Sequence, residues 1–294
     1  MTRYGHFIRL AVLISMIIMG LFLTALVSAL LLLLTGSSLE DLMEMGRQGT
    51  GSFAPGVTRL LLLAQHLLTF IFPGLLFGYI FYRPKTFAGL DLDKKPLWIS
   101  AIFGVMFLMV SYPLVNLSFQ FNELIPLPSW ALDFEDQAEE TLRAILQMDN
   151  PWIFLANLLT IAILPGIGEE LIFRGIVQKE IGRILKSPLI AIWVTGFIFS
   201  AIHLQFEGFL PRMVLGVVLG YLYYWTKNLW VPIIAHMFNN GIQVALIYFA
   251  GMDITEIDKQ GTGPLAWWMF PVCIGIMYWL SQNLIKNQTR GDTV

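Results

Sequence analysis

The sequence predicts an all-α membrane protein, a polytopic bundle of about eight transmembrane helices. Of its 294 residues, 56% are hydrophobic and only 13% are charged, and the mean hydropathy is +0.70. Soluble domains carry roughly 25% charged residues. Apolar stretches close to the ~20 residues needed to cross a bilayer recur along the chain. We therefore expect a single membrane domain over residues 1–294.

Eight apolar stretches are candidate spans, and the fifth and sixth are short. The first exceeds the apolar core of a signal peptide, about 7–15 residues, so we expect it to be retained as a span. Trp and Tyr cluster near the ends of the stretches, as in the aromatic belts at membrane interfaces. In chain order the stretches are Phe7–Leu34, Val57–Tyr82, Leu97–Leu117, Trp152–Gln178, Pro188–Leu204, Pro211–Trp225, Trp230–Phe249 and Leu265–Leu284.

The basic residues orient this bundle, because cytoplasmic loops of membrane proteins are enriched in Lys and Arg. With eight spans and a cytoplasmic N-terminus, the inner segments hold 12 of the 18 basic residues and the outer segments hold 5. The remaining one, Arg174, lies inside the membrane. We therefore expect a multi-pass protein of a bacterial inner membrane with both termini in the cytoplasm.

The longest outer connection, Ser118–Pro151, contains a predicted amphipathic helix over Asp133–Met148. Asp133 is a suitable N-cap residue for this helix. Two interpretations remain open, an interfacial helix and a lid that controls substrate entry. The apolar face of the predicted helix carries Ala138, Leu142, Ile145 and Leu146.

Glycine spacing gives one packing prediction. Gly216 and Gly220 lie four residues apart in the sixth stretch, a spacing that lets two helices approach closely. Glycine is common in membrane helices, so we expect packing within the bundle rather than dimerisation through this motif.

Two function classes are excluded by composition. No basic cluster exceeds a few residues, so we expect no nucleic-acid partner. The single cysteine, Cys273, lies in an apolar run and is expected to be a small buried hydrophobe. One cysteine forms neither an internal disulfide nor a cysteine-based metal site.

The most polar part of an apolar segment is the stretch Pro165–Gly175, which carries Glu169, Glu170 and Arg174. An ionisable side chain inside a membrane span costs about 2.5–3.5 kcal/mol on insertion scales and is a functional-site candidate. On a helix, Glu170 and Arg174 are i, i+4 neighbours and are expected to pair. Glu169 points elsewhere and stays free for chemistry. A helix end with snorkelling charges is the alternative interpretation.

Two further polar pairs lie in the fifth and seventh stretches, Phe199-x-x-x-His203 and His236-x-x-x-Asn240. Each pair has i, i+4 spacing and shares one helical face. Polar groups in a bilayer need partners away from lipid, so we expect one shared cavity for these residues and the Glu169–Arg174 group. Two other histidines, His6 and His66, match no such pattern.

This set of side chains suits hydrolysis of an amide bond. A glutamate with a histidine forms a general base for water, and His with Asn supplies donors for a developing oxyanion. We find no Ser or Cys nucleophile beside His236, and Ser200 lies on a different face from His203. Attack by activated water is therefore preferred over an acyl-enzyme.

The three motifs resemble, in order and rough separation, those of the CPBP (Abi) family, the CAAX-protease and bacteriocin-processing intramembrane endopeptidases, which includes the Ras-converting type II CAAX prenyl endopeptidase. The resemblance covers residues 152–250, the expected catalytic core. It implies that Glu169 and His203 activate water and that His236 and Asn240 stabilise the oxyanion. It gives Glu170 and Arg174 supporting roles.

Two alternatives to a metal-free protease remain. A zinc-dependent version would use His203, His236 and Glu169 as ligands with an open fourth position. The sequence lacks His-Glu-x-x-His, and pairing of Glu170 with Arg174 leaves few outer carboxylates to support a metal. A non-catalytic membrane scaffold or immunity protein would keep the motifs for packing. The preferred hypothesis needs no cofactor, and its partners are the bilayer and a membrane-associated protein or peptide substrate.

Overall fold

A computed structural model describes residues 3–34, 54–94, 98–253 and 268–291 of the chain. Within those ranges the chain forms helices and no strands, which confirms the all-α prediction. Three segments marked η are π-helical. The elements are α1 Arg3–Leu34, α3 Pro55–Gln65, η2 His66–Ile71, α4 Phe72–Phe81, α5 Thr86–Gly89, α6 Trp98–Glu123, α7 Ser129–Ile145, α8 Pro151–Asn157, η3 Leu158–Ile163, α9 Leu164–Ile172, η4 Phe173–Val177, α10 Gln178–Leu185, α11 Pro188–Ala201, α12 Phe209–Thr226, α13 Trp230–Ala250 and α15 Met269–Gly291.

Helices occupy most of the described part of each of the eight predicted spans. Five helical stretches are long and apolar enough to cross a membrane. The remaining three stretches are occupied by α11, a shorter apolar helix, and by α12 and α15. Residues 265–267 of the eighth predicted span lie outside the described ranges. The five candidate spans are Tyr4–Leu31, Pro55–Phe81, Trp98–Glu123, Pro151–Leu185 and Trp230–Ala250.

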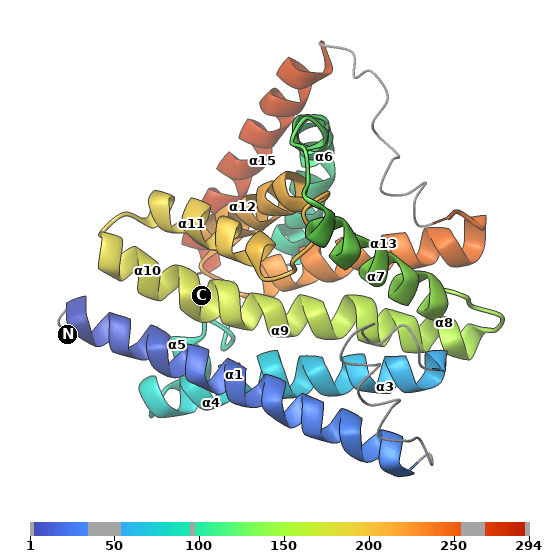
Figure 1. Ribbon diagram of the computed structural model, residues 1–294. Coiled ribbons are helices and arrows are strands. Elements are labelled where there is room, and N and C mark those ends of the chain that lie inside the picture. Colours follow the sequence, from blue (N-terminus) through green and yellow to red (C-terminus); the bar gives the residue numbers. More distant parts are fainter. Residues whose placement is uncertain (1–2, 35–53, 95–97, 254–267, 292–294) are drawn as a thin grey trace.

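The centre of the fold is the helical rod from α8 through α10, which runs across the bundle in Figure 1. Helix α1 and segment η2 contact the rod on one side, and α11 and α13 contact it elsewhere. Nearly every residue of the rod between Pro165 and Gln178 is buried. Large apolar side chains on the outward face of α1, such as Ile18 and Phe22, are exposed, as expected for a surface solvated by lipid tails.

Two of the π-segments lie directly before prolines. Segment η2 precedes Pro73 in α4, and η3 precedes Pro165 in α9. Proline has no N–H, so the carbonyl four residues earlier loses its helical donor. Upstream of Pro165, the carbonyl of Ile161 accepts a hydrogen bond from another helix. Proline therefore shapes the rod without breaking it.

The glycines of the sixth predicted span pack inside the bundle, as expected. A Cβ atom on Gly216 would lie 3.1 Å from the Cα atom of Gly196 in α11, and one on Gly220 would lie 2.9 Å from the Cγ2 atom of Ile192. The backbones of α11 and α12 therefore meet with no room for a side chain. The Gly216 carbonyl is left close enough to the rod to accept a hydrogen bond from it.

Helix α7 differs from the prediction at both ends. It begins at Ser129, after the extended residue Pro128, and ends at Ile145. The predicted start and cap at Asp133 are therefore wrong, because the proline sets the helix start four residues earlier. The predicted apolar face is partly confirmed, since Ile145 and Leu146 are buried in a cluster with Val244 of α13.

The N-terminal end of α1 is tied to α10 by Glu180, whose side chain is fully buried. His6 Nδ1 lies 2.5 Å from Glu180 Oε2, and Arg9 Nη1 lies 3.4 Å from Oε1. The Tyr82 hydroxyl and the Arg183 guanidinium donate to the same Oε1 atom. His6, which matches no motif, therefore has a structural partner far away in the sequence.

We expect Glu180→Ala to destabilise the fold by about 3–5 kcal/mol, because it leaves partly buried cations without their carboxylate. The measurement is the midpoint of thermal unfolding in detergent. Glu139→Ala removes an exposed partner of Arg143 and serves as the control. Equal midpoints for the two variants would show that the buried cluster contributes nothing to stability.

Candidate active site

Glu170 and Arg174 form the expected i, i+4 ion pair. Arg174 Nη1 donates to Glu170 Oε1 at 2.6 Å, and both side chains are fully buried. Arg174 Nη2 donates to the carbonyl of Gly216 at 2.7 Å. The planar guanidinium therefore links its own helix to α12, a geometry that its fixed fork of donors permits.

His236 joins this ion pair from α13. Its Nδ1 atom lies 2.8 Å from Glu170 Oε1, the same oxygen that Arg174 contacts. An ionised carboxylate only accepts hydrogen bonds, so His236 Nδ1 carries the proton and donates. Glu170 therefore has two partners, Arg174 and His236. Glu170 also orients an imidazole, and it leaves His236 Nε2 directed at Glu169, 4.0 Å from Oε2.

His203 approaches Glu169 from the other side. Helix α11 ends at Ala201, so the prediction that His203 lies within a span ending at Leu204 is wrong, and the residue lies in the following turn. The i, i+4 relation survives, because His203 Nδ1 lies 2.7 Å from the carbonyl of Phe199. A carbonyl accepts, so Nδ1 donates here too, and Nε2 lies 4.0 Å from Glu169 Oε2.

Glu169 is thus placed between two imidazoles whose Nε2 atoms face the same carboxylate oxygen. A separation of 4.0 Å is too long for a direct hydrogen bond and leaves space for a water molecule that contacts both groups. The side chain of Glu169 is 8% exposed and that of His203 is 26% exposed. His203 is therefore the more open edge of the group.

Phe199, four residues before His203, packs against three members of the site. Its ring is buried and lies 5.1 Å from the ring of His203 and 6.0 Å from the ring of His236. The guanidinium carbon of Arg174 lies 5.0 Å from the same ring centroid. One aromatic side chain therefore separates and packs against three members of the site.

Asn240 lies one turn after His236 on α13 but makes different contacts. Its Nδ2 atom donates to the Ile161 carbonyl at 3.1 Å. Its Oδ1 atom accepts from Asn239 at 3.0 Å. Among the described residues, approaches of 4.0 Å or less link the other five predicted site residues, whereas Asn240 bonds Ile161 on the rod and Asn239 on its own helix.

Two further residues near the site belong to none of the three motifs. Arg212, assigned above to an outer segment, lies within electrostatic range of Glu169 and His203 and is held by Gln205. His66, on η2, lies within electrostatic range of His203 and His236. Neither belongs to a local pattern, so only the packing of η2 and α12 against the rod brings them close.

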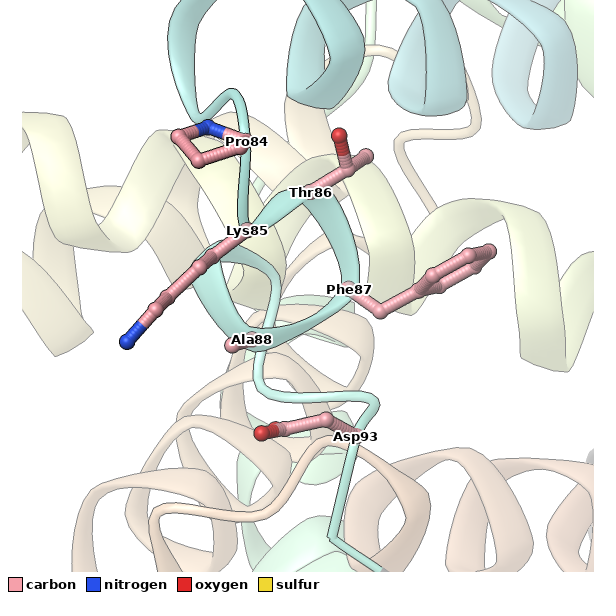
Figure 2. Close-up of a pocket in the computed structure, with 6 residues that line it drawn as sticks. All are labelled: Pro84, Lys85, Thr86, Phe87, Ala88 and Asp93. Atoms are coloured by element: carbon pink, nitrogen blue, oxygen red, sulfur yellow. The ribbon is translucent and has the colours of Figure 1, made fainter.

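An open surface pocket of about 490 Å³ lies elsewhere (Figure 2). None of the six predicted site residues lines it. It is formed by the connection between α4 and α6, with the Lys85 side chain at one edge and Asp93 below the short α5 helix. Its lining comprises Pro84, Lys85, Thr86, Phe87, Ala88 and Asp93.

Comparison with known proteins confirms the resemblance suggested by the motifs. Residues 151–242 match the family described as type II CAAX prenyl endopeptidase Rce1-like. That range contains all three motifs, from Glu169 to Asn240. The remainder of the chain, outside 151–242, lies beyond the match.

Two curated bacterial proteins are similar over part of their length. The uncharacterized protein YpbD of Bacillus subtilis is 28% identical over 110 residues, which cover 36% of this chain and 53% of that protein. The membrane-embedded CAAX protease MroQ of Staphylococcus aureus is 34% identical over 89 residues, which cover 29% of this chain and 36% of that protein. The chain thus spans about half the length of the first relative and about a third of the length of the second. No solved structure matches it significantly.

Proposed function

We propose that this protein is an intramembrane endopeptidase that hydrolyses a peptide bond with water activated by Glu169. The observation that carries the proposal is the convergence of two imidazole Nε2 atoms on one buried glutamate oxygen, each at 4.0 Å. The match of residues 151–242 to a CAAX prenyl endopeptidase family supports it. The similarity to a membrane-embedded CAAX protease supports it as well.

In the proposed reaction, Glu169 and His203 remove a proton from water as its oxygen attacks the peptide carbonyl carbon. The carbonyl oxygen becomes the oxyanion, and the proton passes to the leaving amine when the C–N bond breaks. Because His236 Nδ1 already donates to Glu170, His236 donates to the oxyanion through Nε2 only when doubly protonated. Asn240 supplies the second donor.

The substrate in this proposal is a membrane-associated protein or peptide. An active group within a bundle of apolar helices meets substrates that enter from the bilayer or lie at its surface. The charge distribution supports a multi-pass protein of a bacterial inner membrane with both termini in the cytoplasm. Two of the outer basic residues in that distribution, Arg47 and Lys259, lie outside the described ranges.

The test compares the membrane proteins of cells that produce wild type with those of cells that produce Glu169→Gln. A substrate should accumulate in its uncleaved form only in the variant cells. Identical protein profiles, with both enzymes present in equal amounts in the membrane, would favour the non-catalytic scaffold or immunity protein.

We further propose that the reaction needs no metal. The charged guanidinium of Arg174 lies beside the site and favours a carboxylate or an oxyanion over a dication. The expected result is full activity after dialysis against a chelator and no stoichiometric zinc in the purified enzyme. The arrangement of Glu170 behind His236 also suits a zinc ligand, so activity that is lost on chelation and restored by zinc would assign zinc to Glu169, His203 and His236.

A further inference from the structure

The turn that carries His203 is held by a residue far away in the sequence. Residues 202–208 connect α11 to α12, and Leu204 within them has a positive φ of 53°. A leucine in this conformation is strained, so the surrounding contacts must maintain it.

Asn122, at the C-terminal end of α6, supplies three hydrogen bonds to this segment and the start of α12. Its Nδ2 atom donates to the carbonyls of Phe206 at 2.8 Å and Glu207 at 3.0 Å. Its Oδ1 atom accepts from the backbone N–H of Leu210 at 2.8 Å. The residue is 3% exposed, so both ends of its carboxamide are used inside the protein. A single side chain thus closes the turn and begins α12.

Other hydrogen bonds also restrain the turn. Arg212 donates to the carbonyl of Gln205 at 3.0 Å and to its side-chain oxygen at 2.8 Å. Ser200 Oγ donates to the carbonyl of Phe209 at 2.6 Å. From α7, Glu135 Oε1 accepts from the N–H of Glu207 at 2.9 Å. Asn122 differs from these because its one side chain bonds two carbonyls of the turn and the first turn of α12 from a separate helix, α6.

We propose that Asn122 is a positioning residue of the active site, which holds the 202–208 turn and thereby keeps the His203 imidazole at its place beside Glu169. His203 has one anchor of its own, the Phe199 carbonyl. Its backbone lies at the start of the turn that Asn122 closes. The catalytic role of Asn122 rests on the proposed function, whereas its restraint of the turn does not.

The test measures kcat and KM for Asn122→Ala with the protein that accumulates in the Glu169→Gln cells as substrate. We expect kcat per folded enzyme to fall roughly 10–100-fold, since a misplacement of about 1 Å can cost about 100-fold. KM should stay close to that of wild type. Asn122→Asp keeps the acceptor for Leu210 but sets a carboxylate against two carbonyls, so it should also lower kcat. It replaces Asn122→Ala in the test if that variant does not fold.

Asn157→Ala is the matched control. Asn157 is also a fully buried asparagine, and it donates to the Ile145 carbonyl at 2.7 Å and accepts from Arg59 at 2.7 Å. Its loss should lower stability without lowering kcat per folded enzyme. Equal kcat values for wild type and the folded Asn122 variants would overturn the proposal, and so would an equal fall in the Asn157 variant.

Hydrogen exchange gives a readout that does not depend on activity. In wild type the amides of Glu207 and Leu210 should be protected, and Asn122→Ala should speed exchange over residues 204–210. Asn157→Ala should leave those rates unchanged. If wild type cleaves nothing, the proposed function fails but the exchange still tests the turn, and unchanged rates in Asn122→Ala would refute the restraint itself.

Discussion

Glu169→Gln should lower the turnover of the purified enzyme by roughly 100–10,000-fold, the usual contribution of a general acid–base group. Glutamine keeps the shape of the side chain but cannot take a proton from water. The two Nε2 atoms that face Glu169 Oε2 would then lack a carboxylate between them. Turnover is measured with the protein that accumulates in the variant cells, at enzyme concentrations corrected for the folded fraction.

Glu140→Gln is the control for this experiment, because Glu140 is an exposed carboxylate on α7. It should cleave at the wild-type rate, and both variants should unfold at the wild-type temperature. A Glu169→Gln enzyme with wild-type turnover would remove Glu169 from the reaction and with it the proposed mechanism.

Arg174→Ala should lower the free energy of unfolding by about 3–5 kcal/mol, because it leaves the fully buried Glu170 without its cation. The Gly216 carbonyl would lose its donor in the same variant. Since Glu170 also orients His236, we expect activity to be lost as well. The unfolding midpoint in detergent and turnover of the remaining folded enzyme report the two effects.

Arg174→Lys separates charge from geometry. A lysine supplies one cationic point, whereas Arg174 bonds Glu170 and Gly216 through two nitrogens of a planar group. We expect partial recovery of stability and little recovery of turnover. Arg143→Ala, at an exposed position on α7, is the stability control. An Arg174→Ala protein as stable as that control would contradict the assigned role of the buried pair.

Most of the site's membership could be predicted from the sequence, because ionisable groups are rare in membrane helices and i, i+4 spacing predicts their pairing. The Glu170–Arg174 pair follows from spacing alone. The contact between Glu170 and His236 does not, since the two residues lie 66 positions apart and nothing local specifies which oxygen faces which helix. Tertiary packing decides it.

The errors have local physical causes. The apolar run through Leu204 suggested a helix up to that residue, but α11 ends at Ala201 and a strained turn follows. Pro128 started α7 earlier than its acidic cap candidate. Asn122 gave no signal, because one asparagine near a helix end carries no pattern, and its role depends on a turn about 84 residues later.

The three π-helical segments have a consequence for alignment of this chain with its relatives. A π-turn closes its hydrogen bond over five residues and so accommodates one residue more than an α-turn. A relative with an ordinary α-helix at η4 would therefore need a one-residue gap near Arg174. Without that gap, every position of α10 would be compared with a neighbour about 100° around the helix. Buried Glu180 would then be matched to a residue on another face.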